Sequence, residues 1–338
     1  MTNQAAYIPE KKGQLKVDDA PVGKPGKGEV LIKNSALAVN PVDWKIQDYG
    51  LFLQKYPNIL GEDVAGTIEE VGEGVTRLQK GQRVIAHCDA LGNGETSHAG
   101  FQLYTVATEI LVSPIPDSLS FEQAVVLPLA ISTAAAGLFQ KNHLALPYPT
   151  LSAKPTGKTL LIWGGSSSVG LTAVQLAHAA GVKTVVTASK KNHDLVKQMG
   201  ADVVVDYSSP NVTEEILAAL KDGEFAGVYD AISEPGTVKQ CADIVDKLGG
   251  GKIALTLPPP ENLPESVKPC GVFAITVATS DAEVGDAVWR KFVPEALSKG
   301  TLQAKPDPLV VGHGLDKAQE AMNKQKDGVS AKKVVFTV

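Results

Sequence analysis

The stretch from Lys158 to Ala180 constrains the fold of this chain more than any other segment. It places a short apolar strand, Thr159 to Trp163, directly before a Gly/Ser turn that opens onto a helix. Such a junction points backbone N–H groups and the positive end of the helix dipole at one spot, which suits a pyrophosphate. A dinucleotide site is therefore the first hypothesis.

The turn itself reads Gly165-Ser166-Ser167-Ser168-Val169-Gly170, a G-x-S-x-x-G pattern in place of G-x-G-x-x-G. Gly165 can form the tight turn, and Gly170 can let the helix pack on the strand. Ser167 has a small side chain, which still lets the backbone come close to a pyrophosphate and adds a hydroxyl. By itself the motif is equally compatible with a plain strand-to-helix turn.

The segments that follow favour the dinucleotide site, because strands and helices alternate in the manner of a parallel sheet with crossover helices. Valine- and isoleucine-rich runs without polar alternation are typical of strands covered on both faces. The predicted strands are Thr184–Ala188, Asp202–Tyr207, Gly227–Ile232 and Lys252–Leu257, and the predicted helices are Asn192–Met199, Val212–Leu220 and Thr237–Leu248. The sequence thus predicts an α/β fold with a Rossmann domain, a doubly wound parallel sheet, over residues 126–279.

The segment after the second strand of this domain distinguishes between the two nicotinamide dinucleotides. An acidic side chain there binds the ribose of NAD, whereas a cation and hydroxyls accommodate the extra phosphate of NADP. The segment reads Ser189-Lys190-Lys191-Asn192-His193 and holds no acid. NADPH is therefore the predicted cofactor, with Ser189 and Lys190 at its phosphate. A solvated helix start is the alternative, chiefly for Lys191.

The first part of the chain has a different pattern of short strands separated by glycine turns. Residues 1–125 and 280–338 are predicted to form a mostly antiparallel β domain, because the last strand has no other place to pair. Proline-rich Leu146–Pro155 is predicted as the outgoing connection. The expected strands are Glu29–Ala38, Val64–Val71, Arg83–His87, Gln102–Thr105 and Lys332–Val338, and the expected C-terminal helices are Asp281–Ser298 and Leu315–Lys326.

Charge and cysteine content exclude some classes of protein. The net charge of −5 gives no basic footprint for nucleic acid. No apolar run approaches the length of a membrane span, and no signal-peptide core is present at the N-terminus. Three scattered cysteines, Cys88, Cys241 and Cys270, form no pair pattern, which suits a reducing compartment. A cytoplasmic protein is expected.

Several motifs in order resemble the medium-chain dehydrogenase/reductase superfamily over the whole chain, with a GroES-like catalytic domain beside the Rossmann domain. They are Asn40-Pro41-Val42-Asp43-Trp44-Lys45, Gly61-Glu62-Asp63-Val64-Ala65-Gly66 followed by VGEGV, Leu127-Pro128, and Gly328-Val329-Ser330 followed by KKVVFTV. By this resemblance the NADPH contacts fall on Val42, Asp43, Trp44, Lys45, Gly165, Ser166, Ser167, Ser168, Val169, Gly170, Ser189, Lys190, Lys191, Asn192, Tyr207, Leu255, Thr256, Val329 and Ser330.

The chain departs from the zinc-dependent members of this superfamily. Their catalytic zinc needs thiolate or imidazole donors at three converging positions, which here carry Asn40, Glu62 and Leu129. The four-cysteine structural zinc loop is also missing. No metal is expected, and hydride delivery to an activated C=C bond or a quinone can proceed on orientation and hydrogen bonding alone.

Among zinc-independent members, the chain is similar to a fungal branch of trans-acting enoyl reductases and ToxD-like or CipB-like oxidoreductases. The similarity rests on NPVDWK, Phe121-Glu122-Gln123-Ala124, Leu127-Pro128, Ile131-Ser132-Thr133-Ala134, Gly164-Gly165-Ser166 and Asp206-Tyr207. The resemblance implies a substrate cleft lined by Ala134, Ala135, Ala136, Gly137, Leu138, Phe139, Gln140, Lys141, Phe273, Ala274, Ile275, Thr276 and Val277.

The expected activity is an NADPH-dependent reduction of an enoyl thioester, enone or enal, with a polyketide synthase as a candidate partner. An aldehyde or quinone reductase of the same fold is one alternative. A noncatalytic NADPH-binding sensor or partner subunit is the other.

Three residues are candidates for the catalytic proton donor. Lys45 could donate to an enolate oxygen or only hold the cofactor. Tyr49 and Tyr56 lie where related enoyl reductases place a proton-donating tyrosine, with packing as the alternative for both.

The prolines from Pro258 to Pro269 interrupt the region where many relatives add a sheet-edge strand and dimerise. Proline removes hydrogen-bond donors from a strand, so a monomer is expected rather than a sheet-edge dimer.

Overall fold

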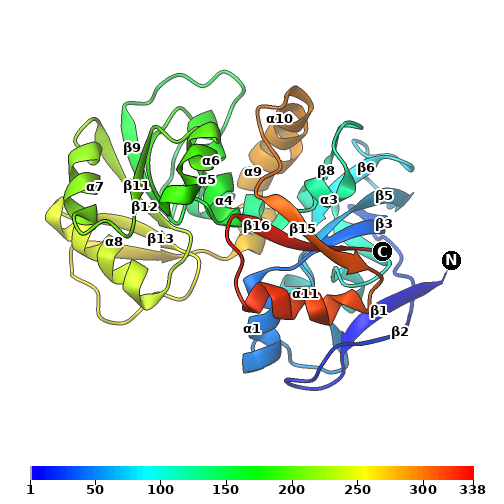
Figure 1. The fold of residues 1–338 in the computed structure, drawn as a ribbon. Helices are drawn as coiled ribbons and strands as arrows, with labels where there is room; N and C mark the ends of the chain where they lie inside the picture. The colour runs from blue at the N-terminus through cyan, green and yellow to red at the C-terminus, as the bar shows by residue number, and fades with distance from the viewer. Residues whose placement is uncertain (1) are drawn as a thin grey trace. The chain divides into compact units, whose positions relative to one another are not determined.

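The computed structural model describes residues 2–338, which divide into two compact units (Figure 1). The first unit contains the chain up to Leu129, residues 297–299 and the segment from Ala304 to the C-terminus, and the second contains residues 130–296 and 300–303. Helices α4 (Pro128–Phe139) and α10 (Val293–Lys299) cross the two boundaries.

The first unit is built mainly of β strands. A seven-stranded sheet has the order β15-β16-β3-β5-β6-β8, with β7 paired to β3, and a three-stranded sheet has the order β2-β1-β4. The strands are β1 (Asn3–Ile8), β2 (Lys16–Ala20), β3 (Glu29–Ala38), β4 (Asn58–Ile59), β5 (Asp63–Val71), β6 (Arg83–His87), β7 (Tyr104–Thr108), β8 (Val112–Pro114), β15 (Asp307–His313) and β16 (Lys332–Thr337). The helices are α1 (Pro41–Tyr49), α2 (Ala90–Asn93), α3 (Phe121–Ala124) and α11 (Lys317–Lys326), with short 3₁₀ turns at Thr96–His98 and Glu109–Leu111.

The last strand joins this sheet, as predicted. β16 pairs antiparallel with β3, through Val335 opposite Ala38, and parallel with β15. Its Phe336 packs edge to face against Phe101, with ring centroids 5.4 Å apart, and both side chains are fully buried. The C-terminal residues therefore complete the core of the first unit.

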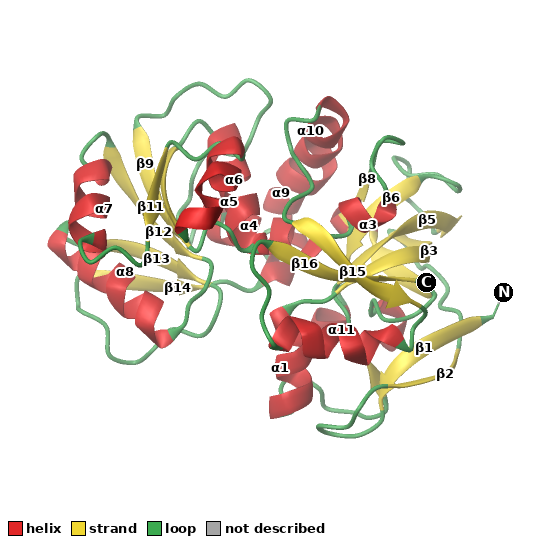
Figure 2. Ribbon diagram, viewed as in Figure 1, coloured by secondary structure: helices red, strands yellow, loops and turns green. Residues whose placement is uncertain are grey.

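The second unit is the predicted Rossmann domain. Its six strands are all parallel in the order β11-β10-β9-β12-β13-β14, with helices on both faces of the sheet (Figure 2). The strands are β9 (Lys158–Trp163), β10 (Lys183–Ala188), β11 (Val203–Asp206), β12 (Glu224–Asp230), β13 (Gly251–Leu255) and β14 (Val267–Gly271). The helices are α5 (Ser168–Ala179), α6 (His193–Gln198), α7 (Val212–Leu220), α8 (Pro235–Lys247) and α9 (Ala282–Gly285), with 3₁₀ turns at Lys190–Asn192 and Ala274–Ala278 and a π-helical segment at Asp286–Phe292.

The boundaries between the units differ from the predicted ones. Proline-rich Leu146–Pro155 is a loop inside the second unit, so its prediction as the connection is wrong; the chain leaves the first unit within α4 instead. Residues 280–296 group with the second unit. Trp289 explains this placement, because its buried indole Nε1 donates to Ser132 Oγ at 2.9 Å on α4.

The helical segment Phe121–Phe139 is long and apolar enough to pass a length-and-composition test for a membrane span, which the sequence interpretation overlooked. Of its most apolar window, 72% is buried inside the protein, as in a core helix.

Strand β14 exists despite the prolines, and it forms one edge of the Rossmann sheet. The carbonyl oxygen of Ser266 and the N–H of Val272 form hydrogen bonds to β13. Because backbone groups alternate in direction along a strand, the backbone N–H positions of Val267, Pro269 and Gly271 face away from β13, towards the open edge. The N–H of Val267 donates to Pro264 O at 2.9 Å, and Pro269 has none. Within the described chain, only Gly271 can offer this edge a donor for a neighbouring strand.

We therefore expect the protein to be a monomer in solution, because a continuous sheet across two copies needs alternating donors along the edge. Light scattering on the purified protein should give the mass of one chain at micromolar concentration. Dimerisation of Pro269→Val alone would support this account, because valine restores the missing N–H donor, whereas a wild-type dimer that Gly271→Pro disrupts would contradict it.

Candidate active site

The predicted dinucleotide turn has the geometry its sequence indicates. β9 ends at Trp163, and the chain turns through Gly164 and Gly165 into α5. A Cβ at Gly165 would lie 2.0 Å from Cγ1 of Val186, and one at Gly170 would lie 2.3 Å from the carbonyl oxygen of Gly164. Both positions therefore require glycine, for the turn and for the contact between helix and strand.

Ser167 is the N-cap of α5. Its hydroxyl accepts from the N–H of Gly170 at 3.0 Å and donates to Gly164 O at 2.8 Å. The hydroxyl of the serine that replaces the usual middle glycine thus forms both of its hydrogen bonds within the turn and stabilises it. The first turn of α5 directs its N–H groups and helix dipole to the carboxyl edge of the sheet, so these residues fit a pyrophosphate.

The loop after β10 also fits the predicted phosphate. Ser189 N-caps a short 3₁₀ turn, and Asn192 Nδ2 donates to its hydroxyl at 3.1 Å. Lys190 and Lys191 are exposed, and Tyr207, after β11, is 47% exposed. Together these side chains form a cationic and hydroxyl-bearing rim with no acid in the loop itself.

The loops after β12 and β13 contain a feature that the sequence interpretation missed. Asp230, which ends β12, is fully buried and accepts three hydrogen bonds, and Ser233 Oγ accepts from Thr256 N at 2.8 Å. Thr256 and the buried Leu255 were predicted as cofactor contacts, whereas nothing was predicted between Asp230 and Ser233. A buried strand ending in Asp, followed by Ser three residues later, was the signal in the sequence.

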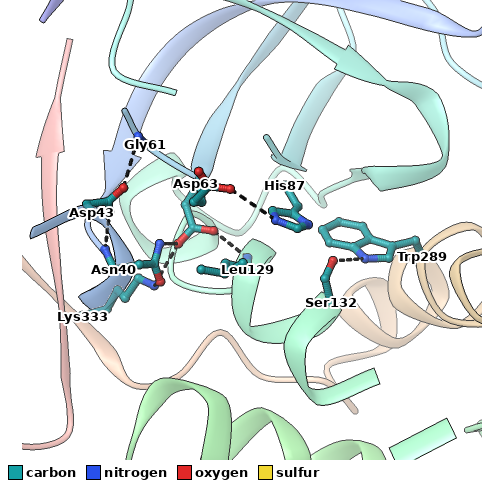
Figure 3. A network of polar contacts seen from close by, with 10 residues as sticks. Asn40, Asp43, Gly61, Asp63, His87, Leu129, Ser132, Trp289 and Lys333 are labelled. Atoms are coloured by element: carbon teal, nitrogen blue, oxygen red, sulfur yellow. Dashed lines mark hydrogen bonds and ion pairs between the residues drawn. The ribbon is translucent and has the colours of Figure 1, made fainter. Parts of the chain in front are cut away.

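In the first unit, α1 is held by two carboxylates (Figure 3). Asp43 Oδ2 accepts from the N–H of Asn40 at 2.7 Å, and its other oxygen accepts from the N–H of Gly61 at 3.1 Å. Asn40 Nδ2 donates to Asp63 Oδ2 at 2.7 Å. Asp43 was predicted as a cofactor contact. It is 0% exposed, so its side chain serves as support.

Asp63 is the centre of this network. Its Oδ1 accepts from the N–H of Leu129 at 2.5 Å, at the start of α4, and its Oδ2 forms an ion pair of 2.8 Å with Lys333 Nζ. Lys333, from β16, also donates to Asn40 Oδ1 and is only 4% exposed. The role of Lys333 was not predicted from the sequence.

The three positions that would hold zinc in zinc-dependent relatives are Asn40, Glu62 and Leu129, and each already has a partner among its neighbours. Both polar atoms of the Asn40 amide are engaged, Leu129 offers an aliphatic side chain, and Glu62 Oε2 lies 3.6 Å from His87 Nε2. Across residues 2–338 there is no group of three or more His, Cys, Asp or Glu side chains that could hold a metal ion.

Burial shifts the protonation equilibria of this cluster. Desolvation, followed by the charge of Asp63, raises the pKa of Glu62 well above its usual range, and desolvation followed by Glu62 does the same for Asp43. Desolvation also lowers the pKa of His87 to about 4. His87 is consequently neutral at pH 7.

His87 should make the folded state sensitive to acid. Since its folded pKa of about 4 lies below the ordinary 6.5, its contribution is present above pH 6.5 and is lost as the pH falls towards 4. Between pH 7 and pH 5 this loss amounts to ~2 kcal/mol. Urea denaturation of wild type and His87→Gln at both pH values should show the loss in wild type only. Glu62 and Asp43, whose raised pKa values change stability with pH in the opposite direction, are present in both proteins and so cancel in the comparison. An equal change in unfolding free energy with pH in both proteins would contradict the assignment to His87.

The predicted proton donors occupy different environments. Tyr49 is 58% exposed, with its ring 6.1 Å from that of Trp44. Lys45 Nζ lies 5.6 Å from the centre of the Trp44 ring. The hydroxyl of Tyr56 is buried and has no hydrogen-bond partner among the described residues.

The remaining predicted site residues divide between core and surface. Ala134, Ala135, Ala136 and Leu138 on α4 are fully buried, and Gly137 packs against Tyr229. Phe139, Gln140, Ile275 and Val277 are also buried, while Gln140 Nε2 donates to Thr276 Oγ1 at 2.6 Å. The more accessible positions are Val42, Lys141, Ser166, Phe273, Ala274, Val329 and Ser330.

Fold and site together define an oxidoreductase of the medium-chain type. The model of the alcohol dehydrogenase GroES-like domain matches residues 26–117, and that of the zinc-binding dehydrogenase matches residues 168–297. The chain belongs to the medium-chain dehydrogenase/reductase superfamily.

Its similarities are more specific than this class. It is 47% identical to the trans-enoyl reductase himH of Aspergillus japonicus over 339 residues, which cover 100% of this chain and 98% of that protein. It is 37% identical to the zinc-binding alcohol dehydrogenase domain-containing protein cipB of Emericella nidulans, over 100% of this chain and 99% of that one. A mycobacterial protein solved in complex with NADPH has the same fold, with a TM-score of 0.73 and 24% identity over 99% of this chain and 100% of the other.

Proposed function

We propose that this protein is an NADPH-dependent reductase that adds hydride to a polarised carbon–carbon double bond without a catalytic metal. The observation that carries the proposal is the saturated network of Asn40, Asp63 and Lys333 at the position of the family's metal. Reversible alcohol oxidation in this superfamily depends on a Lewis acid to stabilise an alkoxide. A conjugated enone, enal or enoyl thioester instead delocalises the charge onto its own carbonyl oxygen.

NADPH is the cofactor that the residues support. Gly165, Gly170 and the first turn of α5 suit the pyrophosphate. Ser189, Lys190 and Tyr207 would offer hydroxyls and a positive charge to the phosphate on the adenosine ribose. When bound, NADPH supplies the hydride.

The chain's own residues then hold the substrate carbonyl and move a proton. A hydrogen-bond donor near the carbonyl oxygen stabilises the enolate that forms when hydride adds to the β-carbon, and one proton then reaches the α-carbon. Tyr56 is the best candidate for the donor, because its buried hydroxyl has no hydrogen-bond partner within residues 2–338 and is available to a ligand. Lys45 is the second candidate. Tyr49 is better suited to a surface role because most of its side chain faces solvent.

Relatives of this chain carry the name trans-enoyl reductase, and this name supports an enoyl thioester as the substrate of the present protein. We propose that the acyl chain arrives on a carrier, with a polyketide synthase as the partner in secondary metabolism.

Oxidation of NADPH by a panel of enones, enals, enoyl thioesters, aldehydes and quinones tests the proposal. Turnover of the conjugated substrates should persist after exhaustive chelation, and product analysis of an enal should show a saturated aldehyde. Reduction of the C=O group instead would indicate an aldehyde reductase. Tight NADPH binding without turnover of any substrate would indicate a sensor and overturn the proposal.

A further inference from the structure

The carboxyl edge of the Rossmann sheet has two walls where the strand order changes direction. β9 and β12 are neighbours, and the chain continues from β9 towards β10 on one side and from β12 towards β13 on the other. In open α/β sheets of this kind, ligands bind in the crevice at that switch point. The turn after β9 forms the first wall, and residues 231–233 after β12 form the second.

The second wall lies directly against the first. The N–H of Ala231 donates to Trp163 O at 3.0 Å. The side chain of Ile232 covers Gly164, where a Cβ would lie 2.4 Å from Ile232 Cγ1. Any displacement of residues 231–233 would therefore alter the crevice beside the dinucleotide turn.

Ser233 holds an unfavourable backbone conformation in this wall. Its φ is +55°, in the left-handed region that a serine rarely adopts. A strained, buried residue at the switch point of the sheet points to a role in binding.

Three residues fix this conformation, and we refer to Asp230, Ser233 and Thr256 as the Asp230 clamp. Asp230 Oδ1 accepts from the N–H groups of Ile232 and Ser233 at 3.0 and 2.9 Å. Ser233 Oγ donates to Asp230 O at 2.7 Å and accepts from Thr256 N at 2.8 Å. The hydroxyl of Ser233 thus ties the loop after β12 to the loop after β13.

The order of the strands indicates which half of the cofactor this wall would meet. The residues suited to the adenosine phosphate follow β10, and the pyrophosphate turn follows β9. A dinucleotide that starts over β10 and crosses β9 places its other half over β12 and β13.

We propose that the Asp230 clamp positions the nicotinamide half of the cofactor, with Ser233 as its key positioning residue. This inference rests on the proposed NADPH dependence. It assigns a role to a loop for which the sequence predicted none.

The test compares two ligands on the full-length protein without substrate. Ser233→Gly keeps the positive φ without strain and removes the hydroxyl. It should raise the Kd for NADPH about tenfold, which corresponds to the loss of about one hydrogen bond. The Kd for 2′,5′-ADP should stay unchanged, since that ligand contains only the adenosine half. Thr159→Val is the matched control, because Thr159 Oγ1 donates to Asp222 O at 3.0 Å at the opposite edge of the same sheet. It should bind both ligands as wild type does.

Equal weakening of NADPH and 2′,5′-ADP in Ser233→Gly, or no weakening of either, would overturn the role of the clamp. A wild-type protein that binds NADPH but reduces no substrate would refute the proposed reductase and leave the clamp standing. A wild-type protein without affinity for NADPH would refute both.

Discussion

Replacing Lys333 by Met should lower the free energy of unfolding by about 3–5 kcal/mol, because it leaves Asp63 as a buried carboxylate without its counter-charge. Lys333 Nζ lies 2.8 Å from Asp63 Oδ2, and the two side chains are 5% and 0% exposed. Methionine matches the length of lysine, so the packing of the stem is preserved. Urea denaturation at pH 7, followed by circular dichroism, measures the change.

The neighbouring residue provides the matched control. Lys332 Nζ lies 3.3 Å from Asp307 Oδ2, but both side chains are largely exposed, and Lys332→Met should cost at most about 1 kcal/mol. The double variant Asp63→Asn/Lys333→Met removes both charges while keeping an oxygen for the N–H of Leu129, and it should recover much of the loss. A Lys333→Met protein as stable as Lys332→Met would show that the buried pair contributes no net stability.

Lys190→Ala should raise the Kd for NADPH by about tenfold to a hundredfold and leave the Kd for NADH unchanged. Hydrogen bonds to charged groups are worth about 1.5–3 kcal/mol, and only NADPH carries the second phosphate. Lys190 is exposed at the end of β10, beside the hydroxyl of Ser189. Fluorescence titration with each dinucleotide gives both constants.

Lys191→Ala tests the specificity of this result, since Lys191 is the adjacent exposed lysine. It should weaken NADPH by no more than about threefold, through long-range charge alone. Equal losses of NADPH and NADH in Lys190→Ala would refute a phosphate contact, and a larger effect at Lys191 would transfer the role to that residue.

Local pattern was sufficient to predict several elements in each unit, although β1, β2, α1 and α4 were not predicted. β3 and β6 have the predicted bounds of Glu29–Ala38 and Arg83–His87, and α7 has those of Val212–Leu220. The strand Gln102–Thr105 was displaced, since β7 spans Tyr104–Thr108. These successes follow because side-chain periodicity and glycine turns are local properties of the sequence.

Long-range contacts were the part that the sequence did not reveal. Lys333 meets Asn40 across 293 residues, and no local pattern marks it as a buried cation. The prolines near β14 argued against a sheet-edge dimer but did not reveal the strand itself, which tolerates Pro269 because the position of its missing N–H faces outward. Ser233 escaped notice because its positive φ depends on Asp230 and Thr256, which only the folded sheet brings together.

The origin of Lys333 in the last strand has a consequence for biosynthesis. The second unit is made almost entirely of one continuous span, residues 130–296, and can acquire its core while the ribosome is still translating the rest. The first unit takes most of its sheet from residues that precede this span, but the ammonium that neutralises Asp63 belongs to Lys333 in β16, which follows it. The ion pair of Asp63 and Lys333 in the first unit can therefore form only after the span of the second unit has been synthesised.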